Sequence, residues 1–383
     1  MTAPTAPAST AAADGLDTPS EQPVEQPVEQ PVEQPVEQPS TDVSLHAFDA
    51  LGKGAPAPYW LHRGVCAAWG LEPMRVDMPL ITVSENATFR LDLDGRPVGV
   101  VRVSQPGYVG GPAAIASEIA WLGALHALDE VRLIDPVPTV RGGFTAVVKD
   151  TRGHGWACVS TRFVEGSPLE ELDDPAECYR TIGRWTALFH EHARSWEPPH
   201  AFERFTWDVP DLVGPTARWG PWEQAVESPE DELLLGRAQA RALELLADLP
   251  ATRDHWGLIH ADLRPSNIMA TADGALTVID FDDCGFGFYL YDFAAALSFV
   301  DHEPYAPAMA RAWVAGYREV SPLTQADLVH ACALAMLRRL QLLGWTTGHR
   351  ADALPPGLFD AQLPGSVECA RRFLDDPLWL LQG

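Results

Sequence analysis

One segment limits the possible folds of this chain more than any other. Residues 258–292 read LIHADLRPSNIMATADGALTVIDFDDCGFGFYLYD, in which short apolar runs alternate with polar positions. An Asp-Gly pair at 273–274 between two apolar arms predicts a β-hairpin. Asp262 and Asn267 precede this hairpin and Asp280 ends its second arm. The hairpin therefore brings a carboxylate, a carboxamide and a second carboxylate together at the mouths of short strands.

Phosphoryl transfer requires this set of groups. The reaction needs an acceptor for the proton of the attacking hydroxyl, oxygen ligands for one or two Mg²⁺ ions, and a held nucleotide. Asp262 suits the first role, and Asn267 and Asp280 suit the second. Polar residues of this kind can also merely cap turns. Three of them at this spacing, each preceded by an apolar strand, favour a catalytic segment instead.

The pattern H-x-D-x-x-x-x-N followed by I-D resembles the catalytic segment of kinase-fold phosphotransferases. It is most similar to the aminoglycoside phosphotransferase family, also called the phosphotransferase enzyme family, in which Gly is usual where this chain has Ala261. The resemblance implies ATP and Mg²⁺ as cofactors and assigns Asp292 to bracing the catalytic loop. We expect His260 to brace this loop as well, rather than to touch the substrate.

An earlier pair of strands is expected in residues 80–103, where two apolar runs flank an Asp-Gly pair at 94–95. In protein kinases the corresponding hairpin holds a Gly-rich loop over the phosphates. Here the loop at 84–88 reads SENAT, which lacks the glycines but resembles the S-E-N-A-T-F-R-V version in one branch of the family. Small and polar residues can still present backbone N–H groups to phosphate. The resemblance thus implies that Ser84 and Asn86 bind the nucleotide.

Arg102 occupies the strand position at which the family normally carries a phosphate-binding Lys. Arginine supplies a permanent charge and a planar fork of donors, so it can reach the α- and β-phosphates. Its usual partner is a Glu on a helix, and Glu118 lies where that helix is expected. The alternative is that Arg102 and Glu118 form an ordinary surface ion pair.

The predicted fold is α+β, a two-lobed protein-kinase-like fold with a small antiparallel-sheet N-lobe and a mainly helical C-lobe. Residues 1–44 contain no Lys or Arg and repeat the tetrapeptide EQPV, so we expect a disordered, acidic, Pro-rich tail. We expect the nucleotide-binding N-lobe at 45–165, and the C-lobe with the catalytic loop and acceptor pocket at 166–383. Helices of the C-lobe are predicted at about 174–196, 228–249, 306–319 and 324–345.

The charge of the chain limits its partners. Lys and Arg number 27 against 53 Asp and Glu, and the formal net charge of −26 argues against nucleic acid or an anionic membrane as the main partner. The tail has no features of a signal peptide, and no later run is long and apolar enough to span a membrane. The six cysteines form no C-x-x-C pair. Neither zinc nor disulfides are therefore indicated, and the cytoplasm is the expected location.

Three functional hypotheses remain. The first is an ATP- and Mg-dependent phosphotransferase that moves the γ-phosphoryl group to a hydroxyl of a small-molecule acceptor, such as an aminoglycoside-like compound, an amino alcohol or another metabolite. The second is a Ser/Thr protein kinase of the bacterial stress-response type. The C-terminal region, with Arg338, Arg339 and Trp345, resembles that branch of kinases. The third is a non-catalytic nucleotide-binding module, motivated by the glycine-poor loop and the Lys-to-Arg change. The sequence leaves open the acceptor, ATP versus GTP, the oligomeric state and the roles of Asp282 and Asp283.

Overall fold

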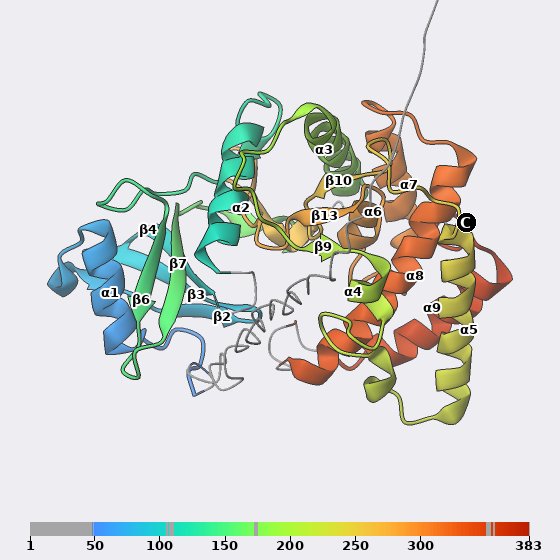
Figure 1. Ribbon diagram of the computed structural model, residues 1–383, viewed down its shortest axis with the longest axis horizontal. Helices are drawn as coiled ribbons and strands as arrows, with labels where there is room; N and C mark the ends of the chain where they lie inside the picture. The colour runs from blue at the N-terminus through green and yellow to red at the C-terminus, as the bar shows by residue number, and fades with distance from the viewer. Residues whose placement is uncertain are drawn as a thin grey trace, which may run out of the picture. The chain divides into compact units, whose positions relative to one another are not determined.

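The computed structural model of the chain describes residues 48, 50–104, 106, 111–171, 175–349, 354 and 357–382. The tail predicted for residues 1–44 lies outside these described residues. Helices and strands carry the labels of Figure 1.

The first half of the described chain forms an antiparallel sheet. Its six strands follow the order β1-β3-β4-β7-β6, with β2 also paired to β3. Asp94 and Gly95, in the turn between β3 and β4, both have positive φ angles, 50° and 75°, as a tight hairpin turn requires. The hairpin predicted around this Asp-Gly pair is therefore confirmed. The strands are β1 (Val76–Asp77), β2 (Leu80–Val83), β3 (Asn86–Leu93), β4 (Arg96–Ser104), β6 (Thr145–Lys149) and β7 (Gly155–Arg162).

Two α-helices accompany this sheet. The first, α1 (Tyr59–Trp69), packs against β6, and α2 (Pro112–Leu125) lies between the sheet and the helical half of the chain (Figure 1). Aromatic side chains hold α1 on the sheet. The Trp60 and Trp156 ring centroids are 5.9 Å apart, and Phe48 lies 5.3 Å from Trp156. This separate aromatic core stabilises the sheet whose strand β4 carries Arg102 and whose strands β2 and β3 flank the loop at 84–85.

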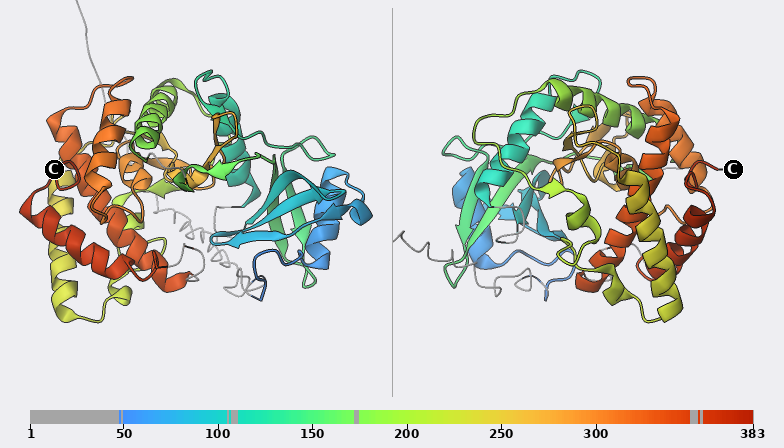
Figure 2. Two further views of the ribbon diagram at one scale, coloured as in Figure 1. Left: turned by 180° about the vertical axis from the view of Figure 1, so that it is seen from behind. Right: turned by 45° about the vertical axis from the view of Figure 1, so that its right-hand side comes forward.

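The second half of the chain is mainly helical. In it α3 packs against α7, α5 packs against α8 and α9, and Figure 2 shows these helices from two further directions. The predicted helices are observed close to their expected limits, whereas α9 was not predicted. Among the described residues, no helix combines the length and the apolar composition needed to cross a membrane. The helices are α3 (Pro175–Ser195), α4 (Val209–Val213), α5 (Pro229–Leu246), α6 (Tyr291–Ala296), α7 (Ala306–Tyr317), α8 (Gln325–Gly348) and α9 (Gln362–Asp375).

Two small sheets position the catalytic segment. The predicted hairpin is present as β11 paired with β12, and Gly274 in its turn has a φ of +79°. Strand β5, from the first half of the chain, adds in parallel to β12, so this sheet links the two halves. The second small sheet has the order β10-β13-β9. The strands are β5 (Arg132–Leu133), β8 (Ser167–Pro168), β9 (Thr206–Trp207), β10 (Trp256–Ile259), β11 (Ile268–Ala270), β12 (Leu276–Val278) and β13 (Gly285–Phe288).

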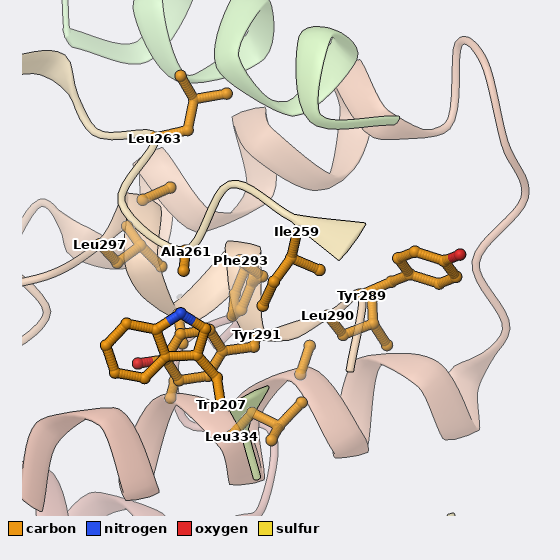
Figure 3. Close-up of a cluster of buried hydrophobic side chains, with 14 of the residues drawn as sticks. Trp207, Ile259, Ala261, Leu263, Tyr289, Leu290, Tyr291, Phe293, Leu297 and Leu334 are labelled. Carbon is orange, nitrogen blue, oxygen red and sulfur yellow. The ribbon is translucent and has the colours of Figure 1, made fainter. Parts of the chain in front are cut away.

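An apolar cluster supports the loop that follows β10 (Figure 3). Ala261 and Leu263 are completely buried in it. Beneath them Trp207 stacks on Tyr291, with ring centroids 5.9 Å apart and an angle of 16° between the ring planes. Asp262 lies between the two buried positions in the sequence. The packing on either side therefore fixes the backbone from which the Asp262 carboxylate extends.

Candidate active site

The loop after β10 is anchored by one buried carboxylate. Asp292, in α6, accepts hydrogen bonds from the backbone N–H groups of His260 (3.1 Å) and Ala261 (2.6 Å). Ala261 has a φ of +64°, a left-handed conformation that glycine adopts at lower cost than any other residue. This conformation explains why Gly is usual at the position. The bracing role predicted for Asp292 is confirmed.

Asp292 is itself held in a buried network. Its Oδ2 lies 2.9 Å from Nε2 of His190, and Nδ1 of His190 lies 3.0 Å from the Tyr317 hydroxyl. Burial lowers the pKa of His190 below its ordinary value, although the neighbouring Asp292 carboxylate opposes this shift. Asp292 is thus held by hydrogen bonds to the loop backbone on one side and to His190 on the other.

Replacement of Asp292 by Ala is expected to lower the free energy of unfolding by about 3 kcal/mol. Two backbone N–H groups and the His190 ring would lose their buried acceptor, and such losses are among the most destabilising single changes. Urea denaturation of the wild type and the variant measures the difference. The matched control is Asp129→Ala, at an exposed position after α2. A loss no larger than that of the control would show that the loop is anchored in another way.

Asp262 lies at the centre of the candidate site. Its Oδ2 accepts hydrogen bonds from Asn267 Nδ2 (2.7 Å) and Arg264 Nε (3.2 Å), and its Oδ1 accepts one from Arg338 (3.3 Å). Because the Asn267 amide nitrogen is directed at Asp262, the amide oxygen points away and remains available as a ligand. His260 is buried, and its Nδ1 accepts the Asp262 backbone N–H at 3.4 Å. His260 therefore braces the loop, as predicted.

Arg102 links α2 to the end of the β11–β12 hairpin. Its guanidinium donates to Glu118 at 2.6 Å and to Asp280 at 3.4 Å. The side chains of Arg102 and Glu118 are only 13% and 4% exposed, so they do not form a surface ion pair. Burial acts to lower the pKa of Arg102, but Glu118, Asp282 and Asp280 outweigh it and hold the pKa above its ordinary value. A permanent positive charge thus lies beside Asp280.

Two further carboxylates lie next to this end of the hairpin. Asn86 donates an amide hydrogen to Asp282 Oδ2, which ties the start of β3 to the catalytic segment. Asp283 is 8% exposed, and its Oδ1 has no hydrogen-bond partner among the described residues. Burial raises the pKa of Asp282 well above its ordinary value, and Asp280 and Asp283 add to the shift. The pKa of Asp283 is raised in the same way by burial and by neighbouring carboxylates.

Two cavities meet at this group of side chains. The larger has a volume of about 420 Å³ and lies between the first sheet and the β11–β12 hairpin, with Val100, Ile119 and Met269 in its apolar wall. The smaller has a volume of about 180 Å³, and the carboxylates that line it are Glu85, Asp262, Asp280, Asp282 and Asp283. The residues that line both cavities are Thr82, Thr88, Arg102, Asn267 and Asp280.

The predicted site residues all lie around these two cavities. Arg102, Asn267 and Asp280 are on the shared wall, and Glu118 lines only the larger cavity. Those that line only the smaller cavity are Asp262, Ser84 and Asn86. The fold thus brings together residues from β3, β4, α2 and the catalytic segment, which are far apart in the sequence.

The oxygen donors on the shared wall suit a hard cation such as Mg²⁺. Asn267 offers its amide oxygen and Asp280 its carboxylate. Within the described ranges, no three His, Cys, Asp or Glu side chains converge on a preformed metal site. Magnesium is usually bound by one or two carboxylates together with substrate phosphates and water, rather than by an all-protein cage. The donor set therefore fits a magnesium ion that binds together with a nucleotide.

Several residues of the smaller cavity escaped prediction. Arg338 of α8 pairs with Asp262, and Glu85 accepts a hydrogen bond from Trp345 Nε1 and lies 3.4 Å from His349 Nε2. These contacts join the loop before β3 to the end of α8. No local pattern around Glu85 indicates this partner. Arg264 carried a signal by its position within the H-x-D-x-x-x-x-N motif.

The chain has a two-lobed kinase-like fold, as predicted. One lobe is the antiparallel sheet with its ion-paired helix α2, and the other is the helical half that holds Asp262, Asn267 and Asp280. Residues 80–323 match the family model described as the phosphotransferase enzyme family, and the chain belongs to this family. The suspected resemblance is confirmed.

Three known proteins illustrate the likeness. The structure of a microcompartment-associated aminopropanol kinase is 33% identical, with a TM-score of 0.74 over 84% of this chain and 99% of that chain. Amicoumacin kinase of Bacillus subtilis (strain 168) is 25% identical over 237 residues, 59% of this chain and 67% of the relative. A homoserine kinase of Gluconobacter oxydans (strain 621H) is 36% identical over 252 residues, 62% of this chain and 75% of the relative.

The chain is accordingly a phosphotransferase that uses a hydroxyl group of a small molecule as its acceptor. The first of the three hypotheses drawn from the sequence is confirmed. Enzymes of this class use ATP and a divalent metal ion.

Proposed function

We propose that the chain transfers the γ-phosphoryl group of ATP to the hydroxyl of a small amino alcohol. The observation that carries this proposal is the pair of adjacent cavities with a shared wall, since Arg102, Asn267 and Asp280 line both of them while Asp262 lines only the smaller. The larger, apolar cavity suits the adenosine, and the smaller suits the acceptor. The likeness to the aminopropanol kinase, which extends over 99% of that chain, supports an amino alcohol as acceptor.

Each predicted residue then has a distinct task. Asp262 orients the acceptor hydroxyl and takes its proton, and Arg102, positioned by Glu118, binds the phosphates. Asn267 and Asp280 would hold the Mg²⁺ ion, which would neutralise phosphate charge. In-line transfer under these conditions needs positioning and charge neutralisation, and no covalent enzyme intermediate.

The loop between β2 and β3 would cover the phosphates in this proposal. Ser84 in this loop and Asn86 at the start of β3 present small polar side chains to the smaller cavity, and Asn86 is tied to Asp282. We assign nucleotide binding mainly to residues 45–165, and the catalytic loop and acceptor pocket to residues 166–383. The net charge of −26 is unfavourable for binding to nucleic acid or to an anionic membrane. The lack of a C-x-x-C pair among the six cysteines supports the cytoplasm as the proposed location.

Homoserine is a second candidate acceptor. It has a primary ammonium group, as aminopropanol does, and a carboxylate in addition. The homoserine kinase of Gluconobacter oxydans is 36% identical to this chain. The smaller cavity also contains Arg264 and Arg338, whose guanidinium groups could meet a carboxylate. Both of them already pair with Asp262, which is why we rank the simpler amino alcohol first.

Transfer of label from γ-labelled ATP to a panel of acceptors tests the proposed function. The panel contains 1-amino-2-propanol, homoserine, an aminoglycoside and added protein, each with and without Mg²⁺. We expect magnesium-dependent labelling of 1-amino-2-propanol. Labelling of added protein alone would favour a protein kinase instead, and nucleotide binding without any transfer would favour a non-catalytic module.

A further inference from the structure

Asp283 differs from the other carboxylates of the smaller cavity because its carboxylate forms no hydrogen bond or ion pair with another described residue. Its side chain is more than nine-tenths buried and lines this cavity, and its Oδ1 has no hydrogen-bond partner in the described part of the chain. Each of the other carboxylates is compensated: Asp262 by Arg264 and Arg338, Asp280 by Arg102, Asp282 by Asn86, and Glu85 by Trp345 and His349.

A buried carboxylate without a partner is unfavourable unless something else compensates it. The groups around Asp283 do not do so, because Asp262 and Glu85 repel its negative charge and Arg338, which attracts it, is already engaged with Asp262. A cation bound inside the cavity would compensate the negative charge of Asp283. In the cavity wall as a whole, five carboxylates face three guanidinium groups, which again favours a cationic ligand over an anionic one.

The size and the remaining wall of the cavity narrow the choice of ligand. Its volume of about 180 Å³ is below the roughly 300–1,000 Å³ of pockets that hold drug-sized ligands, so the acceptor is a molecule of few heavy atoms. Phe299, Leu342 and Leu354 provide apolar surface, which suits a short carbon chain. A carbon chain with an ammonium group at one end and a hydroxyl near Asp262 matches both parts of the wall.

We propose that Asp283 binds the primary ammonium group of the acceptor and thereby sets the preference of the enzyme for amines over neutral alcohols. This inference rests on the proposed function and names the residue responsible for its substrate class. Asp262 then acts on the hydroxyl end of the same molecule, and Asp283 fixes the other end. Asp283 is a binding and specificity residue and takes no part in proton transfer.

A comparison of two acceptors with the same carbon skeleton tests the proposal. Kinetics are measured with 1-amino-2-propanol and with propane-1,2-diol, for the wild type, Asp283→Asn and the exposed control Asp129→Asn. We expect Asp283→Asn to lower kcat/KM for the amine about 100-fold, mainly through KM, because a buried charge pair loses one partner. The kcat/KM for the diol and the KM for ATP should stay at the values of the control, and the melting temperature should be no lower than that of the control.

Three further measurements make each outcome decisive. Calorimetry measures the binding of 1-amino-2-propanol in the presence of Mg²⁺ and ADP. It shows the loss of affinity for the amine in Asp283→Asn even if the diol is turned over too slowly to measure. Asp283→Glu keeps the carboxylate and should retain the preference for amines. This variant therefore tests the proposal even if Asp283→Asn does not fold stably. If homoserine is the acceptor, 4-hydroxybutyrate takes the place of the diol, since it lacks only the ammonium group.

Equal losses for the amine and the neutral acceptor would overturn the inference and indicate a structural role for Asp283. Unchanged kinetics with both acceptors would overturn it as well. A higher Mg²⁺ requirement in Asp283→Asn, with unchanged selectivity, would assign the residue to the metal instead. Failure of the proposed function is distinct from all of these outcomes, because in that case the wild type itself would phosphorylate no amino alcohol.

Discussion

Asp262→Asn is expected to lower kcat by about 10³-fold while the affinity for Mg·ATP stays unchanged. A general base acts on a proton that moves in the transition state, so its loss affects turnover rather than ground-state binding of the nucleotide. Asp262 lines only the smaller cavity, and the substitution therefore leaves the walls of the larger one intact. Steady-state kinetics with the best acceptor of the panel give kcat, and thermal-shift titration with ATP gives the affinity.

The surroundings of Asp262 favour the amide substitution over alanine. The amide keeps the size of the side chain, and Arg338 retains its hydrogen bonds to the Tyr291 hydroxyl (2.7 Å) and Ser298 (3.2 Å). The fold should consequently survive, which the melting temperature will show. Asp129→Asn again serves as the control. An equal loss of ATP binding, or a kcat that remains at the control value, would contradict the assignment of Asp262 as base.

The parts of the structure that depend on neighbouring residues could be predicted from the sequence. The β11–β12 hairpin follows from an Asp-Gly pair between two apolar arms, and its glycine takes the positive φ that this turn needs. Asp262, Asn267 and Asp280 were found because the hairpin itself brings them together. Arg102 and Glu118 were found through the resemblance to the family, and their 2.6 Å contact is observed.

Contacts that depend on the packing of distant elements could not be predicted. Arg338 is separated from Asp262 by 76 residues, and it reaches the site only because α8 packs against α6. Glu85 meets Trp345 across 260 residues. No periodicity or turn signal encodes such a meeting, since it is decided by how whole helices pack. The wall of the smaller cavity, to which α8 and the loop before β3 contribute, therefore becomes visible only in the structure.

The second large effect is expected from Asp280→Asn. Mg·ATP at about 100 times its Kd should stabilise the wild type by about 2.7 kcal/mol, and the variant should lose the part of this stabilisation that depends on magnesium. The reason is that an amide lacks the charge with which a carboxylate binds a hard cation. We expect kcat/KM to fall by about 10³-fold, since the metal contributes several kcal/mol to the stabilisation of the transferring group. Thermal-shift titrations with ATP, with and without Mg²⁺, measure the first effect.

The titration without magnesium separates two roles that Asp280 could have. Arg102 contacts Asp280 at 3.4 Å but is held more closely by Glu118, at 2.6 Å, so it should stay in place in the variant. Nucleotide binding in the absence of Mg²⁺ should therefore be retained, because the apolar wall and Arg102 are intact. If this binding is lost together with the magnesium effect, Asp280 serves to position Arg102 and the metal is held elsewhere. If the magnesium effect alone is lost, Asp280 binds the metal directly.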